Sequence, residues 1–148
     1  MSAPCAQVEL AIPARADFLA LARQVVVAVA RTDDAFDEDR LDDLRLAVSE
    51  ACSNAIRAHS AIGSEAQVRL SCRLRRGCIE VEVCDEGRGF DPARVRSAPP
   101  AGDPERLLFE SGLGIPLMQR IADHTEIRSS TAGTRVRMVL FAASALSA

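Results

Sequence analysis

The chain has 148 residues, 48% of them hydrophobic and 26% charged, and its net charge is −3. This size and composition are typical of one soluble domain, so we expect residues 1–148 to form a single domain with its own core. The acidic balance and the scattered arginines argue against direct nucleic-acid binding, and the lack of a long apolar run or a leader sequence predicts a cytoplasmic protein without membrane attachment.

The N-terminal half predicts one strand and two helices. Residues 8–12 alternate between apolar and polar and predict a short strand, which Pro13 ends. The Ala/Val/Leu-rich residues 16–30 predict a first helix. From Leu41 onward, apolar residues recur at three- and four-residue spacing, so we expect a second, amphipathic helix that is broken near Gly63.

The C-terminal half predicts four strands, one helix and one long loop. The strands are expected at 68–74, 78–84, 126–130 and 134–141, the helix at 112–123, and the proline-rich loop at 90–111. This order implies an α/β fold, more narrowly an α+β two-layer sandwich. Its sheet would be mixed but mostly antiparallel, with helices on one face.

Five cysteines are spread over the chain, at Cys5, Cys52, Cys72, Cys78 and Cys84. Their odd number and the absence of a CxxC pair argue against a disulfide framework or a zinc site. We expect them to be small, buried, apolar thiols.

The second helix carries a polar pair on an otherwise apolar sequence, LRLAVSEACSNAIRAHS. Glu50 and Asn54 are one helical turn apart and therefore share a face, roughly 100–140° from the centre of the apolar stripe. A carboxylate can take a proton, and an amide oxygen can bind a hard cation. The small neighbours Ala47 and Ala58 would leave room for a ligand. The alternative is an ordinary solvated helix face.

A glycine-rich turn comes after the strand that ends at Asp85. Gly87 and Gly89 would let the backbone approach a planar or anionic ligand, and the Asp85 carboxylate can accept a hydrogen bond from an exocyclic amine. No helix comes next and no GK[ST] is present, so neither a dinucleotide-binding fingerprint nor a P-loop is indicated. A plain hairpin turn is the alternative.

A second glycine-rich segment, Gly112-Leu113-Gly114, opens the third helix. Unpaired N–H groups and the positive dipole end make a helix N-terminus suited to phosphate. Thr134, at the start of the last strand, could bond a ligand. Each feature also has an ordinary structural explanation, a helix start and a β-favouring threonine.

Taken in order, these motifs resemble the GHKL ATPase superfamily, which includes gyrase, histidine kinases and MutL. The resemblance covers about residues 8–141. It is greatest to the stand-alone RsbW/SpoIIAB-type anti-sigma factors, which are serine/threonine-protein kinases. The run AVSEACSNAI is similar to their N-box and GLGIPLMQRIAD to their second glycine box.

The resemblance implies a role for each polar residue. Asn54 would ligate a Mg²⁺ that bridges the ATP phosphates, and Glu50 would be the general base for the incoming hydroxyl. Asp85 would bind the adenine amino group, with Thr134 in support. Such a set suits phosphoryl transfer, which depends on positioning and charge neutralisation.

The resemblance also implies how the nucleotide is enclosed. The adenine and phosphate walls would be formed by Gly87, Gly89, Gly112, Leu113 and Gly114, and residues 90–111 would be a mobile ATP lid. Two features depart from the family pattern.

The first departure is in the N-box helix, where a histidine common in the family is replaced by Ala58. A histidine stands one residue later, at His59, rotated toward the apolar stripe and therefore not expected in the site. The second is Glu110, which stands where the kinases often carry an arginine. Arg106 is the nearest upstream arginine that could contact the phosphates.

By the same resemblance, the partners would be a sigma factor or another regulator and a STAS-domain anti-sigma antagonist, which would be phosphorylated on serine. The uncovered sheet face and the first helix could form a homodimer interface. Two alternatives stay open: a nucleotide-gated binding switch without kinase activity, and a catalytic domain that serves a histidine phosphotransfer partner.

Overall fold

The computed structural model describes residues 5–87 and 114–143. The elements follow in the order β1 (Ala6–Ile12), η1 (Ala16–Phe18), α1 (Leu19–Ala30), α2 (Glu38–Ala61), β2 (Val68–Arg75), β3 (Cys78–Asp85), α4 (Gly114–Ile121), β4 (His124–Ser130) and β5 (Gly133–Phe141). These bounds agree with the sequence-based expectations to within a few residues. In this part of the chain, no helix has the length and apolarity needed to cross a membrane.

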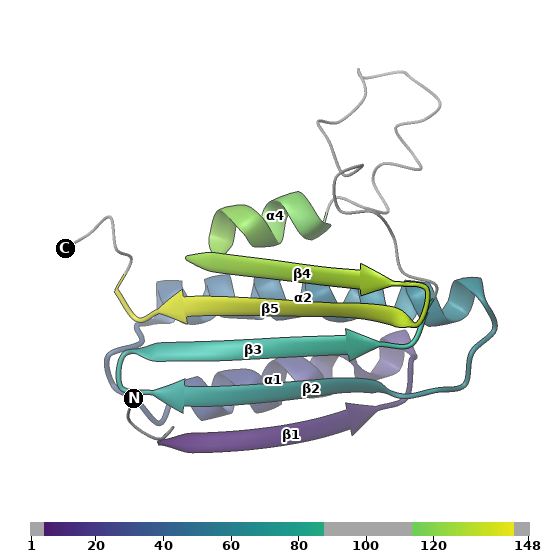
Figure 1. The fold of residues 1–148 in the computed structure, drawn as a ribbon. Coiled ribbons are helices and arrows are strands. Elements are labelled where there is room, and N and C mark those ends of the chain that lie inside the picture. The colour runs from purple at the N-terminus through teal and green to yellow at the C-terminus, as the bar shows by residue number, and fades with distance from the viewer. Residues whose placement is uncertain (1–4, 88–113, 144–148) are drawn as a thin grey trace, which may run out of the picture.

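The strands form one sheet in the order β1-β2-β3-β5-β4, with the helices on one face (Figure 1). The predicted two-layer α+β sandwich is therefore confirmed. The described pairings are all antiparallel, so the expected mixed character is wrong in detail. Two hairpins require antiparallel partners. Between β1 and β2 the chain runs along one face of the sheet twice, through α1 and then α2. It thereby returns to the end of β1, where Ile12 pairs with Val68.

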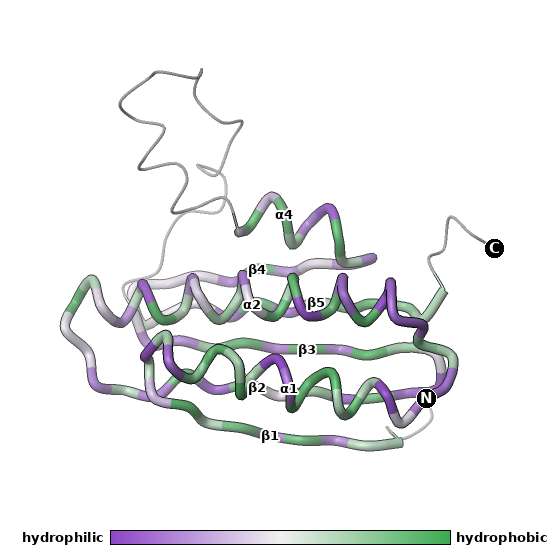
Figure 2. The backbone as a smooth tube through the Cα atoms, turned by 180° about the vertical axis from the view of Figure 1, so that it is seen from behind, coloured by the Kyte–Doolittle hydropathy of each residue, from purple (hydrophilic) through white to green (hydrophobic). Residues whose placement is uncertain are grey.

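The core lies between the sheet and the helices. Strand β2 alternates between buried and partly exposed residues, as a strand covered on one face must. The buried residues of α1 and α2 pack against the sheet, whereas Leu21 and Leu46 of the same helices are exposed. Figure 2 shows hydrophobic and hydrophilic residues interspersed along both helices. From α2 the buried side chains are Leu41, Leu44, Ala47, Val48, Ala51, Cys52, Ala55, Ile56 and His59. The thiols of Cys52 and Cys72 are buried as expected, but Cys5 is exposed.

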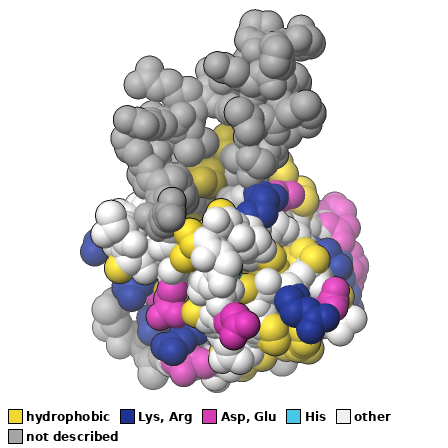
Figure 3. Space-filling view, turned by 90° about the vertical axis from the view of Figure 1, so that its right-hand side faces the viewer, with side chains coloured by type: hydrophobic (Ala, Val, Ile, Leu, Met, Phe, Trp, Pro, Cys, Tyr) yellow, Lys and Arg dark blue, Asp and Glu magenta, His cyan; other side chains and the backbone are white. Residues whose placement is uncertain are grey.

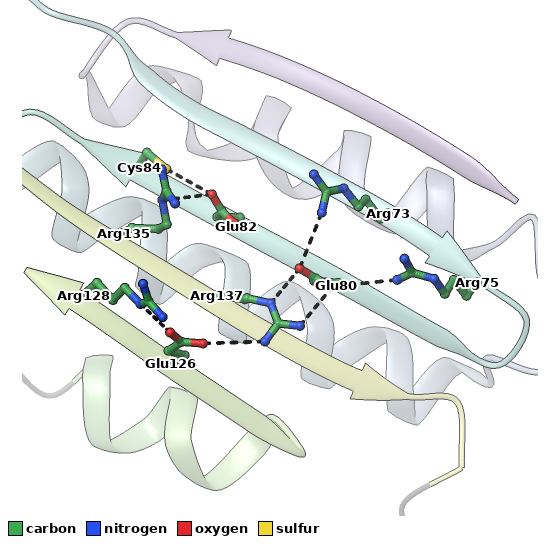
Figure 4. A network of polar contacts seen from close by, with 9 residues as sticks. All are labelled: Arg73, Arg75, Glu80, Glu82, Cys84, Glu126, Arg128, Arg135 and Arg137. Atoms are coloured by element: carbon green, nitrogen blue, oxygen red, sulfur yellow. Dashed lines mark hydrogen bonds and ion pairs between the residues drawn. The ribbon is translucent and has the colours of Figure 1, made fainter. Parts of the chain in front are cut away.

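The uncovered face of the sheet carries a lattice of charges (Figure 4). Its centre is Glu80, which accepts hydrogen bonds of 2.7 and 3.3 Å from Arg137 and lies 3.9 Å from Arg73 and 3.8 Å from Arg75. The bond from Arg137 is the main reason that the pKa of Glu80 is lowered. Arginines that are scattered along the sequence are therefore gathered on this face by the strand order.

A second polar cluster joins the start of α2 to the end of the sheet. Arg40 donates to the carbonyl oxygens of Phe141 (2.7 Å) and Ile121 (3.3 Å) and pairs with the carboxylates of Asp43 and Asp123. The Asp123 carboxylate also accepts the N–H of Phe141 at 2.8 Å. The side chains of Arg40 and Asp123 are only 11% and 13% exposed, so each neutralises a charge that water reaches poorly.

We expect Arg40→Met to lower the free energy of unfolding by about 3 kcal/mol, because it leaves Asp123 partly buried without its counter-charge. Urea denaturation measures the loss. Arg45→Met is the matched control, since the pairs of Arg45 with Asp42 and Glu38 are more exposed and should contribute below about 1 kcal/mol.

Adding Asp123→Asn to Arg40→Met should recover part of the loss, because a neutral amide needs no counter-charge and still accepts from Phe141. Equal losses for Arg40→Met and Arg45→Met would contradict this assignment.

Candidate functional site

Asp85 and Thr134 lie at one end of the molecule, where β3 ends and β5 begins, and the other predicted site residues that the structure describes come from α2, the turn after β3 and α4 (Figure 1). Figure 3 views the molecule from this end. Glu50 and Asn54 come from α2, Asp85 from the end of β3 and Thr134 from the start of β5. Gly87 lies just after β3, and Gly114 begins α4. The predicted residues Gly89, Arg106, Gly112 and Leu113, the loop 90–111 and Glu110 lie outside the described residues.

Glu50 and Asn54 are half-buried and one turn apart on α2, outside its buried stripe. The Asn54 Oδ1 accepts a hydrogen bond from the guanidinium of Arg57. The Asn54 Nδ2 is buried and has no partner among the described residues. The amide oxygen, the atom that would bind a metal ion, is therefore engaged by a guanidinium in this structure, and a metal ligand here would have to exchange Arg57 for the ion.

Asp85 ends β3 with its side chain held by backbone donors. Its Oδ1 accepts the N–H of Gly87 at 2.9 Å and the N–H of Thr134 at 3.3 Å, whereas Oδ2 has no partner in the described part of the chain. Burial raises the pKa of the carboxyl, against the smaller opposing effects of these two hydrogen bonds and of nearby His59. A partly desolvated carboxylate with a spare oxygen is a chemically competent acceptor for an external donor.

The β4–β5 hairpin forms the other wall of this end of the sheet. Gly133 has φ +141°, and a Cβ there would come within 2.0 Å of the Asp85 carbonyl oxygen, so only glycine fits. The side chain of Thr134 is 6% exposed and its hydroxyl bonds that of Ser129 at 2.8 Å. An open pocket of about 300 Å³ lies beside Asp85 and Thr134 and is also lined by Arg128.

The last turn of α2 contacts the turn after β3, and this pairing was not expected from the sequence. The space beside Ala58 is filled by Gly87, where an added Cβ would lie 2.7 Å from the Ala58 Cβ. The Nε2 of His59 accepts the N–H of Glu86 at 3.0 Å. We call these four residues the α2–turn contact.

The position of His59 is partly as the sequence indicated. Its side chain is fully buried on the apolar side of α2, and no histidine shows on the described surface in Figure 3. It nevertheless touches the site from inside the core, which the helical spacing did not predict. A histidine at an apolar position of a helix was the available signal, because a buried imidazole requires a polar partner.

The described residues do not form a metal site by themselves, since they contain no group of three or more His, Cys, Asp or Glu side chains that could hold an ion. The Asn54 amide oxygen could supply one ligand to a Mg²⁺, which would then need its other ligands from outside the described residues.

Comparisons with known proteins identify the family and the fold. The family model described as "Histidine kinase-like ATPase domain" matches residues 12–140. The chain is 32% identical over 125 residues to the serine-protein kinase RsbW of Bacillus cereus. The aligned residues cover 82% of this chain and 76% of that relative.

Two solved structures share the fold. The RsbU and RsbW domains of a Mycobacterium tuberculosis protein match with a TM-score of 0.65 at 15% identity, covering 93% of this chain and 32% of that one. The SiaB–SiaC complex from Pseudomonas aeruginosa matches with a TM-score of 0.63 at 12% identity, covering 90% of this chain and 88% of that one. This chain thus spans about a third of the Mycobacterium chain.

We expect Gly87→Ala to lower the free energy of unfolding by about 1–3 kcal/mol, because the new Cβ collides with Ala58 and shifts the turn. Adding Ala58→Gly should restore part of the turn's position, although glycine in a helix costs about 1 kcal/mol. Thermal denaturation and the amide chemical shifts of the turn measure both effects.

The matched control for this clash is Gly63→Ala, because a Cβ at Gly63 would meet no atom within 4 Å and only its φ of +63° opposes the change. Unchanged chemical shifts at the turn in Gly87→Ala would show that the α2–turn contact is not closely packed.

Asp85→Asn should make the protein more stable at neutral pH. The raised pKa means that the folded state holds the Asp85 proton more tightly than the unfolded state does. The contribution of Asp85 to wild-type stability therefore falls as the pH rises from 3.8, the ordinary value, through the raised pKa. Asparagine avoids this loss and still accepts from Gly87 and Thr134, so its advantage should vanish in acid.

Urea denaturation at neutral and acidic pH tests the sign, and Asp33→Asn is a control of opposite sign. Hydrogen bonds from the N–H groups of Gly77 and Ala35 lower the pKa of Asp33, so this variant should be less stable than wild type at neutral pH. The same pH profile for both variants would contradict the assignment to Asp85.

Proposed function

Since the chain belongs to the histidine kinase-like ATPase domain family, and within it is similar to the relatives named serine-protein kinase RsbW, we propose that it is an ATP-dependent protein-serine/threonine kinase. The observation that carries this proposal is the Glu50–Asn54 pair on α2. It supplies a carboxylate that can act as a base and an amide oxygen one helical turn away, and α2 contacts the turn after Asp85 at Ala58 and His59.

Each residue of the site has a distinct part in the proposed reaction. The Asp85 Oδ2 accepts a hydrogen bond from the adenine amino group. Thr134, which donates its N–H to the other carboxylate oxygen, holds Asp85 in place. Asn54 holds the cation that neutralises charge on the phosphate oxygens. The remaining contacts to the adenine and the phosphates stay predictions. They are assigned to Gly87, Gly89, Arg106, Gly112, Leu113 and Gly114.

Glu50 completes the proposed transfer. The serine hydroxyl oxygen attacks the γ-phosphorus, the bond to the β–γ bridging oxygen breaks, and ADP leaves. Glu50 takes the hydroxyl proton as the new ester bond forms. Its half-buried position lets it meet a hydroxyl delivered from outside rather than one within the chain.

The proposed acceptor is a serine of a STAS-domain anti-sigma antagonist, and the proposed second partner is a sigma factor or another regulator. The name of the Bacillus cereus relative, a serine-protein kinase, supports a serine acceptor. A cytoplasmic location and a homodimer stay predictions. Against a homodimer through the open sheet face stands its charge lattice, because the buried centres of protein interfaces are depleted in charged residues.

A second candidate function is a nucleotide-gated switch that binds partners without transferring phosphate. The observation that favours it is Glu110, which stands where the resembling kinases carry an arginine. A missing phosphate contact would weaken transition-state stabilisation more than ground-state binding.

Transfer to the cognate STAS protein tests the proposal. We expect serine phosphorylation with Mg-ATP, and we expect Glu50→Gln to slow it by about 10²–10⁴-fold, the usual contribution of a general base. Calorimetry should show Mg-ATP affinity within about twofold of wild type for this variant, since Glu50 acts on the acceptor. Glu65→Gln, an exposed glutamate outside the site, is the matched control.

The metal dependence is tested with Asn54→Ala. This variant should weaken Mg-ATP binding by about tenfold or more, yet bind ATP as wild type does when a chelator removes the metal. Mg-ATP binding by wild type without any transfer would favour the switch, and full transfer by Glu50→Gln would reject Glu50 as the base.

A further inference from the structure

The α2–turn contact contains a side chain that neither the family resemblance nor the proposed chemistry uses. His59 is fully buried, and its Nε2 accepts the N–H of Glu86 at 3.0 Å. Its Nδ1 is also buried and has no partner among the described residues. Burying an unpaired polar atom costs free energy, so an apolar side chain would serve packing alone better. The feature that distinguishes the imidazole from an apolar side chain here is therefore Nε2, which accepts the hydrogen bond from Glu86.

The position of that acceptor matters because it fixes the turn after β3 to the rest of the protein. Glu86 comes directly after Asp85, and the Gly87 N–H donates to Asp85 within the same turn. That local bond moves with the turn and cannot anchor it. From outside, β5 holds the start of the turn, because Thr134 pairs with Asp85 in the sheet and donates its N–H to the Asp85 carboxylate at 3.3 Å. His59 is the side chain of α2 that bonds the turn itself, at Glu86.

His59 also connects the two halves of the site. It is fixed on α2, the helix that carries Glu50 and Asn54, and it bonds the residue next to the base-recognition carboxylate. Beside it, Ala58 abuts Gly87 and limits how near the turn can come, while the imidazole limits how far it can move away. Together they set the position of Asp85 relative to the catalytic helix.

We propose that His59 is a positioning residue for nucleotide-base recognition, acting through the Glu86 N–H to place the Asp85 carboxylate. The inference rests on the proposed function, since it takes Asp85 as the group that meets the base. It predicts that discrimination between bases, more than phosphate binding, depends on a side chain that is hidden in the core.

The test compares His59→Gln with His59→Leu. The glutamine amide oxygen can reach the place of Nε2 and accept from Glu86, whereas leucine fills a similar volume without an acceptor. Calorimetry measures the affinities for Mg-ATP, Mg-GTP and magnesium tripolyphosphate, the last of which has no base. Ile56→Val, a mild change in the same buried stripe, controls for lost stability.

We expect His59→Leu to lose about tenfold in Mg-ATP affinity and most of the ATP-over-GTP preference, while tripolyphosphate affinity changes less than about twofold. His59→Gln should keep the wild-type ratio, and so should Ile56→Val. In an Asp85→Asn background, His59→Leu should add little further loss, because both changes remove the same interaction.

An unchanged ATP-over-GTP ratio in His59→Leu would overturn this inference and leave the proposed function standing. A wild-type protein that does not bind ATP would instead reject the proposed function and this inference together. Should His59→Leu fail to fold, hydrogen exchange of wild type decides: a Glu86 amide that exchanges as fast as a free amide means that His59 does not hold the turn.

Discussion

The buried stripe of α2 is the constraint on which the rest of the structure depends. The stripe packs on the sheet and between α1 and α4, and close packing leaves the helix one rotation about its axis. That rotation gives Glu50 and Asn54 a fixed direction without any bond from their side chains to the sheet. The same packing brings the last turn of the helix against the turn after β3, so one helix carries the Glu50–Asn54 pair and positions the strand end.

Polar groups near the two ends of α2 differ in how completely they are hydrogen-bonded or paired with an opposite charge. Around Arg40 each described charge meets an opposite charge or a backbone group, and the cluster is complete. At the far end Asp85 is partly desolvated, and buried nitrogens of Asn54 and His59 have no partner in the described part of the chain. Unfavourable groups of this kind concentrate where a protein binds or reacts, because stability alone would not retain them.

The sequence was sufficient for the elements and for the order of the motifs. Period-two and helical spacings follow from local geometry, so the five strands and the long helix were predictable to within a few residues. Residue spacing alone did not predict the Asp85–Thr134 pairing, which only the family resemblance implied, because register between residues 49 positions apart depends on the whole sheet.

The α2–turn contact escaped prediction for a related reason. The sequence assigned Ala58 to an open ligand space and His59 to the core, but neither pattern says what lies opposite. In the same way, the arginines of β2 and β5 give no sign of a lattice until the strand order β2-β3-β5 places them on either side of Glu80.

The Arg40 cluster has a consequence for synthesis on the ribosome. Its bonds to Ile121 and Phe141 join residues 81 and 101 positions apart, and the partner strand β5 is the last described element of the chain. Until those residues have emerged, the Arg40 guanidinium of a growing chain has only Asp43, on its own helix, as a partner in this cluster. Because β5 pairs with both β3 and β4, the sheet stays incomplete until β5 has been made, and a chain that lacks β5 exposes apolar core surface to chaperones and proteases.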